Sequence, residues 1–317
     1  MLSLRTPRGL AALCCLWASL AAAPGVAGTV VRFHTVMGDF DLQLFDSQMP
    51  RTVTNFLHYV NTNKFDGTVV HRNSDTSDPA PRDFVIQGGG FSLNDPVPPQ
   101  TTITFDNVPT IAPIADEPGG GVTGLSNLRG TIAMAKSGPN TVTSQWFINQ
   151  GNNSFLDDPT RQDGGFSAFG AVLGNGMTVV DAIGDLPLPP NFGFSIGSPF
   201  NDLPLRNFTG NSIDDIRVAN TVTVTDIRVL NLPAGDFDRN GLVNGADLTI
   251  WRTNYGVSAG ALLDKGDADM DGDVDGSDFL VWQRNVGASV TPFAAVPEPA
   301  AATLALLCTA GLLRRRK

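Results

Sequence analysis

The chain has 317 residues, with 31 acidic and 21 basic side chains and a formal net charge of −10. This acidity argues against a basic nucleic-acid groove, and a content of 42% hydrophobic and 16% charged residues indicates a globular protein rather than a disordered one. The three cysteines, Cys14, Cys15 and Cys308, all lie near the ends of the chain. The body therefore lacks the thiols of a disulfide scaffold, a zinc–thiolate site or a cysteine nucleophile.

Residues 1–28 have the layout of a secretory signal peptide. Arg5 and Arg8 precede a short apolar core at 10–23, and small residues follow up to Gly28. A retained membrane anchor is the alternative, but the apolar run is short for a span. We therefore expect cleavage around 23–28 and export of the remainder.

Residues 29–232 contain a hairpin and a helix near their beginning. The segment 30–45 alternates about a turn at 37–38, which predicts a β-hairpin. The segment 49–63 has apolar residues at i, i+3, i+4 and i+7, which predicts an amphipathic helix with Thr52 or Thr54 as its cap.

The rest of this region reads as short strands between loops rich in Gly, Pro and Asn. A second helix is expected at 176–186. Many strands with two helices suggest a closed barrel with helices at its ends. The predicted strands lie at 84–91, 129–135, 144–150, 166–173 and 220–230.

Several of these segments occur in the order seen in one enzyme family. They are GDFDLQLFDSQMPRTVTNFLHYV, VVHR, FVIQGGGF, GLSNLRGTIAMAKSGPNTVTSQWFINQ, NSFLDD and FSAFGAVLGNGMTVVDAI. From about residue 31 to 183 the chain resembles bacterial cyclophilin-type peptidyl-prolyl cis-trans isomerases (EC 5.2.1.8), and the run 221–230 fits their closing strand. The resemblance implies a mainly β fold, with a closed antiparallel β-barrel and two capping helices.

The chemistry implied by this resemblance is rotation about an Xaa-Pro bond in proline-containing polypeptides. No bond breaks, so the reaction needs no nucleophile and no cofactor. At the twisted amide the prolyl nitrogen regains a lone pair, and a fixed cationic donor stabilises that state more than either planar one. By resemblance the donor is Arg72 of VVHR, held by a hydrogen bond from its side chain to Gln87 of IQGGG.

The same resemblance implies a substrate groove. Its apolar pocket for the proline ring would be lined by Phe84, Val85, Phe147, Leu156 and Phe166, the last where many relatives have His. Positions that bind the substrate backbone or line the groove are matched by Ala135, Lys136 and Gln145, with Lys136 where many relatives have Asn. Taken alone, each of these apolar residues would be ordinary core.

Three loops depart from the family pattern. The connection 73–83 is longer than usual in the family and could reposition Arg72 relative to Phe84 or shade the groove. The loop 158–165 and the Pro-rich stretch 187–207 are also long. Phe155 stands where the animal enzymes have a Trp that helps to bind cyclosporin, so we expect weak cyclosporin binding.

A repeat follows at 236–287. Asp236 matches Asp267 and Trp251 matches Trp282 at one constant offset, and oxygen-bearing residues fall at calcium-loop spacing with Gly241 and Gly272 at the sharp turn. Two calcium ions are expected; solvated acidic loops are the alternative. The predicted ligands are Asp236, Asp238, Asn240, Leu242 through its carbonyl, Asn244 and Asp247, then Asp267, Asp269, Asp271, Asp273 through its carbonyl, Asp275 and Asp278.

Paired loops with Asp at position 12, each followed by one helix, resemble a dockerin domain over about 235–288. The resemblance implies a small α-helical domain that folds on calcium and docks onto a cohesin-like module, although nothing in the sequence identifies that partner. Carboxylates facing few bases repel one another without an ion, which also favours folding on calcium.

The chain ends in a short linker, 289–296, and a segment at 297–317 made of Pro-Glu-Pro, an apolar stretch and four basic residues. This layout resembles the PEP-CTERM sorting signals of Gram-negative bacteria, which an exosortase-type membrane protease removes. A plain tail anchor is the alternative. Both alternatives predict a body outside the cytoplasm: at the cell envelope, on the outer surface or extracellular. With a sorting signal, the C-terminal segment would anchor the chain in the membrane only transiently.

Three functions remain open from the sequence. The first is an exported prolyl isomerase that is tethered by a calcium-dependent module. The second is a non-catalytic protein that binds proline-containing segments or serves as a scaffold of the cell surface. The third is a calcium-bound surface protein with a structural role, for which loss of Arg72 would be silent. Arg72 and Gln87 together favour the first.

Overall fold

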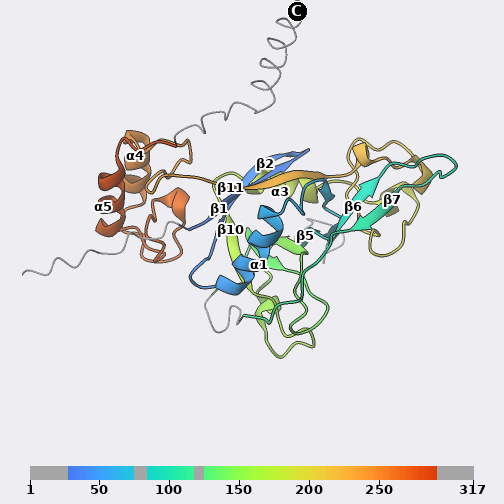
Figure 1. The fold of residues 1–317 in the computed structure, drawn as a ribbon, viewed down its shortest axis with the longest axis horizontal. Coiled ribbons are helices and arrows are strands. Elements are labelled where there is room, and N and C mark those ends of the chain that lie inside the picture. The colour runs from blue at the N-terminus through green and yellow to red at the C-terminus, as the bar shows by residue number, and fades with distance from the viewer. Residues whose placement is uncertain (1–27, 75–83, 118–124, 291–317) are drawn as a thin grey trace, which may run out of the picture.

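The computed structural model describes residues 28–74, 84–117 and 125–290 and is built mainly of β-strands (Figure 1). The strands form one sheet in the order β4-β5-β9-β8-β10-β2-β1-β11-β3-β6-β7, and every pair in it is antiparallel. Their bounds are β1 Val30–Thr35, β2 Gly38–Leu44, β3 Thr68–Val69, β4 Arg72–Ser74, β5 Val85–Gly88, β6 Phe91–Asn94, β7 Thr104–Asn107, β8 Thr131–Met134, β9 Trp146–Asn149, β10 Ala168–Val172 and β11 Thr223–Leu230.

The strand order runs from β4 to β7, and no pairing joins these two strands in the described part of the chain, so this order does not show the closed barrel expected from the sequence. The outer edge of β4 is instead occupied by a loop, since Asn73 N donates to Asp202 O at 2.8 Å. Two further backbone hydrogen bonds hold the residues between β3 and β4. Val70 N donates to Val222 O, just before β11, and His71 N donates to Gln87 O of β5. Barrel closure itself stays a prediction.

Two helices flank the sheet, as the apolar spacing predicts: α1 (Pro50–Asn61) and α3 (Met177–Gly184). The expected Thr cap of α1 is wrong. The helix begins with Pro50 at its first turn, and its free N–H groups at Arg51 and Thr52 donate to the Glu117 carboxylate at 3.0 and 2.7 Å. A carboxylate suits this end because the helix dipole is positive there.

The main core lies between α1 and the sheet and is rich in aromatic rings. Phe33 stacks on Phe40 with ring centroids 4.8 Å apart and meets Trp146 edge-on at 5.2 Å. Phe56 of α1 packs against Phe169 of β10 at 5.2 Å. This core supports β5, β8 and β9 from behind.

A second apolar core packs the long stretch after α3, residues 185–222, against the hairpin of β6 and β7. Phe200, Leu203 and Leu205 are buried in it against Phe91 of β6. In Figure 1 this yellow stretch lies beside β6 and β7, at the end of the molecule away from α4 and α5. The short 3₁₀ turns of the fold are η1 Ser154–Asp157, η2 Pro189–Phe192, η3 Ile213–Asp215, η4 Val218–Asn220 and η5 Leu263–Lys265.

The C-terminal repeat forms two matched loop–helix units, with helices α4 (Gly245–Asn254) and α5 (Gly276–Asn285). Each helix is capped alike: the side chains of Asn244 and Asp275 accept from the N–H two residues on, at 2.7 and 2.6 Å. The units also cross-link. Trp251 of α4 donates to Asp275 O at 2.8 Å, and Trp282 of α5 donates to Asn244 O at 2.9 Å.

This repeat module packs directly on the sheet. Arg239 pairs with Asp41 of β2 at 3.0 Å, and Leu263 N donates to the buried side chain of Gln43 at 2.7 Å. A shared apolar cluster joins Val30 and Leu173 of the sheet to residues of the module, among them Phe237. The module is therefore docked on β1, β2 and the end of β10.

No helix within the described ranges 28–74, 84–117 and 125–290 is both long and apolar enough to cross a membrane. The predicted export segments at 1–27 and 297–317 lie outside the described residues.

Candidate active site

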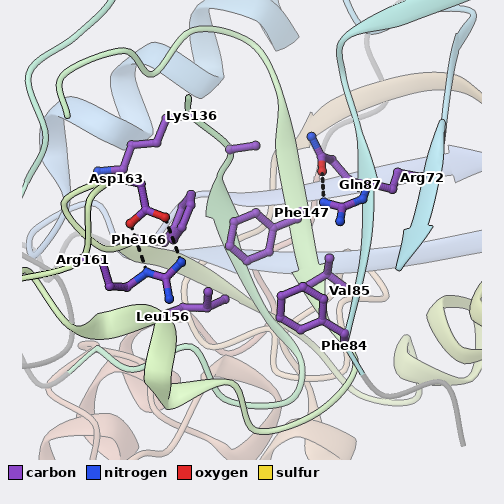
Figure 2. A pocket seen from close by; sticks show the side chains of 11 residues that line it. Arg72, Phe84, Val85, Gln87, Lys136, Phe147, Leu156, Arg161, Asp163 and Phe166 are labelled. Atoms are coloured by element: carbon purple, nitrogen blue, oxygen red, sulfur yellow. Dashed lines mark hydrogen bonds and ion pairs between the residues drawn. The ribbon is translucent and has the colours of Figure 1, made fainter. Parts of the chain in front are cut away.

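A hollow of about 320 Å³ opens on the sheet where β4, β5, β8 and β9 meet the loop before β10 (Figure 2). It brings together nine of the ten residues predicted for the groove, and Gln145 lies in an adjoining hollow. The lining residues are Arg72, Phe84, Val85, Gln87, Ala135, Lys136, Phe147, Leu156, Arg161, Asp163 and Phe166. The hollow thus gathers these positions in one place, and their assignment as a substrate groove stays a prediction.

Arg72 and Gln87 face each other because β4 and β5 pair in a register that sets these two residues directly opposite. Arg72 Nη1 donates to Gln87 Oε1 at 3.4 Å (Figure 2), and Nη2 donates to Ser74 Oγ at 3.1 Å. Gln87 in turn donates from Nε2 to Gln145 Oε1 at 2.8 Å. A half-exposed guanidinium is thus held at the rim of the hollow with N–H groups left for a ligand.

The three glycines after Gln87 let large side chains approach the backbone. A Cβ on Gly88 would lie 2.6 Å from the Trp146 ring, and one on Gly89 would lie 2.7 Å from it. Gly89 also has φ +75°, which favours glycine. The GGG run is therefore needed to seat Trp146 beneath β5, and this contact fixes the strand that carries Gln87.

The floor of the hollow is apolar. Val85, Phe147 and Leu156 are buried and form a small cluster with the half-buried Phe84 and Phe166. Phe147 and Phe166 meet edge-on with centroids 5.5 Å apart. Such a floor beside a guanidinium can take a compact apolar ring whose neighbouring amide lies against the donors.

Lys136 lies on the wall of the hollow, but its side chain is only 3% exposed. Its Nζ pairs with Asp116 at 2.7 Å and lies 5.6 Å from the centre of the Phe166 ring. The ammonium is therefore already partnered. The adjoining hollow, of about 260 Å³, is lined by Gln87, Ala135, Lys136, Ser137, Thr141, Thr143 and Gln145.

Two charged residues of the rim were missed from the sequence. Arg161 and Asp163 form an ion pair at 2.8 Å (Figure 2), and Arg161 lies 5.9 Å from the centre of the Phe166 ring. The pairing lowers the pKa of Asp163 and raises that of Arg161. The unusual length of 158–165 was the available signal, but length alone does not say which way a loop folds.

The predicted calcium ligands fall into three carboxylate groups, and within each group the oxygens lie within 4.8 Å of one another. These groups are Asp236, Asp238 and Asp247; Asp267, Asp269 and Asp271; and Asp273, Asp275 and Asp278. Asp273 was predicted to use its backbone carbonyl, whereas here its side chain joins Asp275 and Asp278.

The neutral predicted ligands lie beside these groups. Asn240 Nδ2 donates to Asp238 Oδ2 at 2.9 Å, and Asn244 Nδ2 donates to Leu242 O at 3.2 Å. The Asn240 side-chain oxygen accepts from Leu242 N at 2.8 Å, and the Asn244 side-chain oxygen caps α4.

The electrostatics of the loops fit a hard divalent cation. Burial, with the nearby carboxylates of Asp278 and Asp269 adding to it, raises the pKa of Asp267 to about 7. Burial and neighbouring carboxylates also raise the pKa of Asp236, Asp269 and Asp273. Moreover, one oxygen each of Asp269 and Asp273 has no hydrogen-bond partner in the described structure. Calcium prefers oxygen ligands, and its charge would offset the repulsion between these carboxylates that raises their pKa values.

Comparison with known proteins gives one consistent family. Residues 30–192 match the family model "Cyclophilin type peptidyl-prolyl cis-trans isomerase/CLD". The chain is 38% identical over 169 residues to a peptidyl-prolyl cis-trans isomerase of Acinetobacter baylyi, which covers 53% of this chain and 78% of the relative. It is 38% identical over 157 residues to peptidyl-prolyl cis-trans isomerase B of Escherichia coli, covering 49% and 83%.

Among solved structures, a cyclophilin-type peptidyl-prolyl cis-trans isomerase of Cryptosporidium parvum matches with a TM-score of 0.43 and 21% identity. The match covers 65% of this chain and 99% of that structure.

Proposed function

The chain belongs to the cyclophilin-type peptidyl-prolyl cis-trans isomerase family, and we propose that it works as an exported isomerase whose catalytic donor is Arg72. The family match establishes the reaction: rotation about Xaa-Pro bonds in proline-containing chains, with no cofactor required. One observation carries the residue assignment, namely that the Arg72–Gln87 pair lies on the rim of an apolar hollow.

The geometry supports a simple mechanism. The proline ring enters the apolar floor at Phe147, Leu156 and Phe166, which fixes one side of the amide. As the amide twists, its nitrogen becomes pyramidal and gains a lone pair. The free N–H groups of Arg72 donate to that lone pair, which stabilises the twisted state and lowers the barrier of about 18–20 kcal/mol.

The test is isomerisation of an Xaa-Pro peptide followed by exchange NMR with the full chain. We expect Arg72→Ala to lower kcat/KM by about 100-fold or more, since a preorganised donor of this kind contributes roughly 3 kcal/mol. Arg228→Ala is the matched control, because Arg228 lies exposed on β11 and pairs only with Asp226 among the described residues. Equal acceleration by wild type and Arg72→Ala would overturn the catalytic assignment of Arg72, whereas no acceleration by wild type would leave the non-catalytic proline-binding role.

We further propose that the body acts outside the cytoplasm. The signal-peptide layout of 1–28 and the PEP-CTERM-like layout of 297–317 support this proposal, with an exosortase-type protease as the processing partner. Fractionation of the expressing cells tests it. Recovery of the full-length chain in the cytosol, with both ends intact by mass spectrometry, would contradict it.

The repeat module is proposed to hold two calcium ions in a dockerin-like domain. The first set of ligands would come from Asp236, Asp238 and Asp247, and the second from the carboxylates between Asp267 and Asp278. The raised carboxyl pKa values and the unpartnered oxygens of Asp269 and Asp273 support this assignment. A cohesin-like partner is the finer expectation that comes with the dockerin resemblance.

Calorimetric titration of the full chain with calcium chloride tests the module. Two equivalents are expected for wild type, and one each for Asp236→Asn and Asp267→Asn. Asp214→Asn, a change in η3 and outside the repeat module, should keep both equivalents. Trp251 and Trp282 give an independent optical signal because each donates to a carbonyl of a loop. A flat titration with unchanged tryptophan emission would exclude the calcium assignment.

A further inference from the structure

The long stretch after α3 places a carboxylate directly against Arg72. Asp202 Oδ2 lies 3.5 Å from Arg72 Nε, and Asp202 O accepts from Asn73 N, the next residue, at 2.8 Å. Phe200 and Leu203, on either side of Asp202, are 4% and 0% exposed in the second apolar core. Asp202 is therefore held in place by packing and by a backbone bond that does not involve its side chain.

With Asp202 included, each nitrogen of the Arg72 guanidinium faces a different oxygen. Nε faces Asp202, Nη1 donates to Gln87 and Nη2 donates to Ser74. A guanidinium has five N–H groups in one plane, so one N–H on Nη1 and one on Nη2 have no partner among the described residues. A planar group that is held on three sides can turn less, and its free N–H groups keep one direction.

We propose that Asp202 is a positioning residue for Arg72: its carboxylate fixes the plane of the guanidinium so that the free N–H groups point toward the twisted amide. This inference rests on the proposed catalytic role of Arg72. The side chain of Arg72 is 41% exposed and that of Asp202 is 39% exposed. Ion pairs of this exposure contribute little to folding stability. The effect of Asp202 is thus expected on the rate of rotation rather than on stability.

The Asp202 carboxylate also has an electrostatic effect on Arg72, and its influence on the rate has the opposite sign. A carboxylate near the guanidinium could draw its charge away from the prolyl nitrogen, in which case removal of Asp202 would speed catalysis. The two effects are therefore separated by the direction of the change in kcat.

The experiment measures kcat and KM separately for the full chain with Asp202→Ala and Asp202→Asn. We expect Asp202→Ala to lower kcat about three- to five-fold with KM unchanged within two-fold. Asp202→Asn keeps an oxygen that can accept from Nε and should recover kcat to within two-fold of wild type. Asp215→Asn removes a charge from the same stretch, where its carboxylate accepts from Asn211 N at 3.1 Å, and should have no effect.

A second readout follows the pair itself. The Nε–Hε NMR signal of Arg72, assigned by its loss in Arg72→Lys, should shift and broaden in Asp202→Ala but not in Asp215→Asn. An unchanged signal, a kcat at or above wild type in Asp202→Ala, or a rise in KM of equal size in both Asp202 variants would overturn the proposal. Failure of the proposed function looks different, because wild type would then be no faster than Arg72→Ala, while the NMR signal would still report on the pair.

Discussion

Gln87 donates a hydrogen bond from Nε2 to Gln145 Oε1 at 2.8 Å, and this bond leaves Gln87 Oε1 turned toward Arg72. An amide that presents its oxygen to a guanidinium must point its nitrogen elsewhere, so Gln145 determines which way Gln87 faces. Gly90 makes room for this arrangement, since a Cβ there would lie 2.7 Å from Gln145 Cδ. The hydrogen-bond chain therefore joins Gln145, the residue before β9, through Gln87 of β5 to Arg72 of β4.

Removal of the Gln145 amide should weaken catalysis without unfolding the protein. We expect Gln145→Ala to lower kcat/KM about three- to ten-fold, because a neutral hydrogen bond contributes roughly 1 kcal/mol and Gln87 becomes free to turn. Exchange NMR on an Xaa-Pro peptide gives the rate, and Gln100→Ala at an exposed loop position is the control. Unchanged kcat/KM in Gln145→Ala would show that Gln87 needs no support.

The Lys136–Asp116 pair should matter for stability. Asp116→Ala leaves the ammonium of Lys136, 3% exposed, without its carboxylate, and we expect unfolding to become easier by about 2–3 kcal/mol. Urea midpoints measure this. The double change Asp116→Ala with Lys136→Met should regain part of the loss, because it removes the uncompensated charge. A double variant less stable than Asp116→Ala would contradict this account.

His71 should make stability depend on pH. It is 2% exposed, its ring lies edge-on to Phe91 and Phe200, and burial followed by the charge of Arg72 lowers its pKa to about 4. Between pH 6.5 and 4 the unfolded chain therefore binds a proton that the folded chain does not. The contribution is complete above pH 6.5 and is lost as the pH falls through 4.

The expected loss from His71 is about 2 kcal/mol between pH 7 and pH 5. Urea unfolding at several pH values measures it. His71→Gln, which does not titrate, should flatten the dependence by that amount, whereas the exposed His58→Gln should leave it unchanged. Parallel pH curves for wild type and His71→Gln would refute the assignment.

The docking of the module on the sheet should be visible in thermal unfolding. Asp41 is 8% exposed in its side chain, and hydrogen bonds from Arg32 and Arg239 outweigh the effect of burial and lower its pKa. We expect Arg239→Ala to lower Tm by about 4–8 °C, for a loss of roughly 2 kcal/mol. Arg252→Ala, exposed on α4, is the control. Two separate transitions in wild type, with neither shifted by Arg239→Ala, would mean that the parts unfold independently.

The sequence predicted the elements that local patterns determine. The amphipathic spacing predicted α1, the run 176–186 was the helix candidate that forms α3, and the alternation at 30–45 predicted β1 and β2. The family resemblance, which extends over several segments, led to nine lining residues of the hollow. The repeat likewise predicted α4 and α5. For the helices and the hairpin the signal lies within a short stretch of chain.

What the sequence did not predict depends on contacts between distant residues. Glu117 caps a helix that begins at Pro50, and Asp202 pairs with Arg72, which is far from it in the sequence. The strand β7 (Thr104–Asn107) is mostly exposed and lacks an apolar alternation, so no pattern marked it. Such contacts follow from how loops pack, and loop length alone carries no direction.

Docking of the repeat module through Arg239, Gln43 and the cluster around Phe237 also has a geometric consequence. A flexible tether would allow many orientations of the groove relative to α4 and α5. A packed interface allows only one. Whatever grips those helices would then aim the groove as well as hold it. The side chains at the contact between β2 and the repeat module, such as Arg239 and Gln43, therefore set the orientation of the groove relative to α4 and α5.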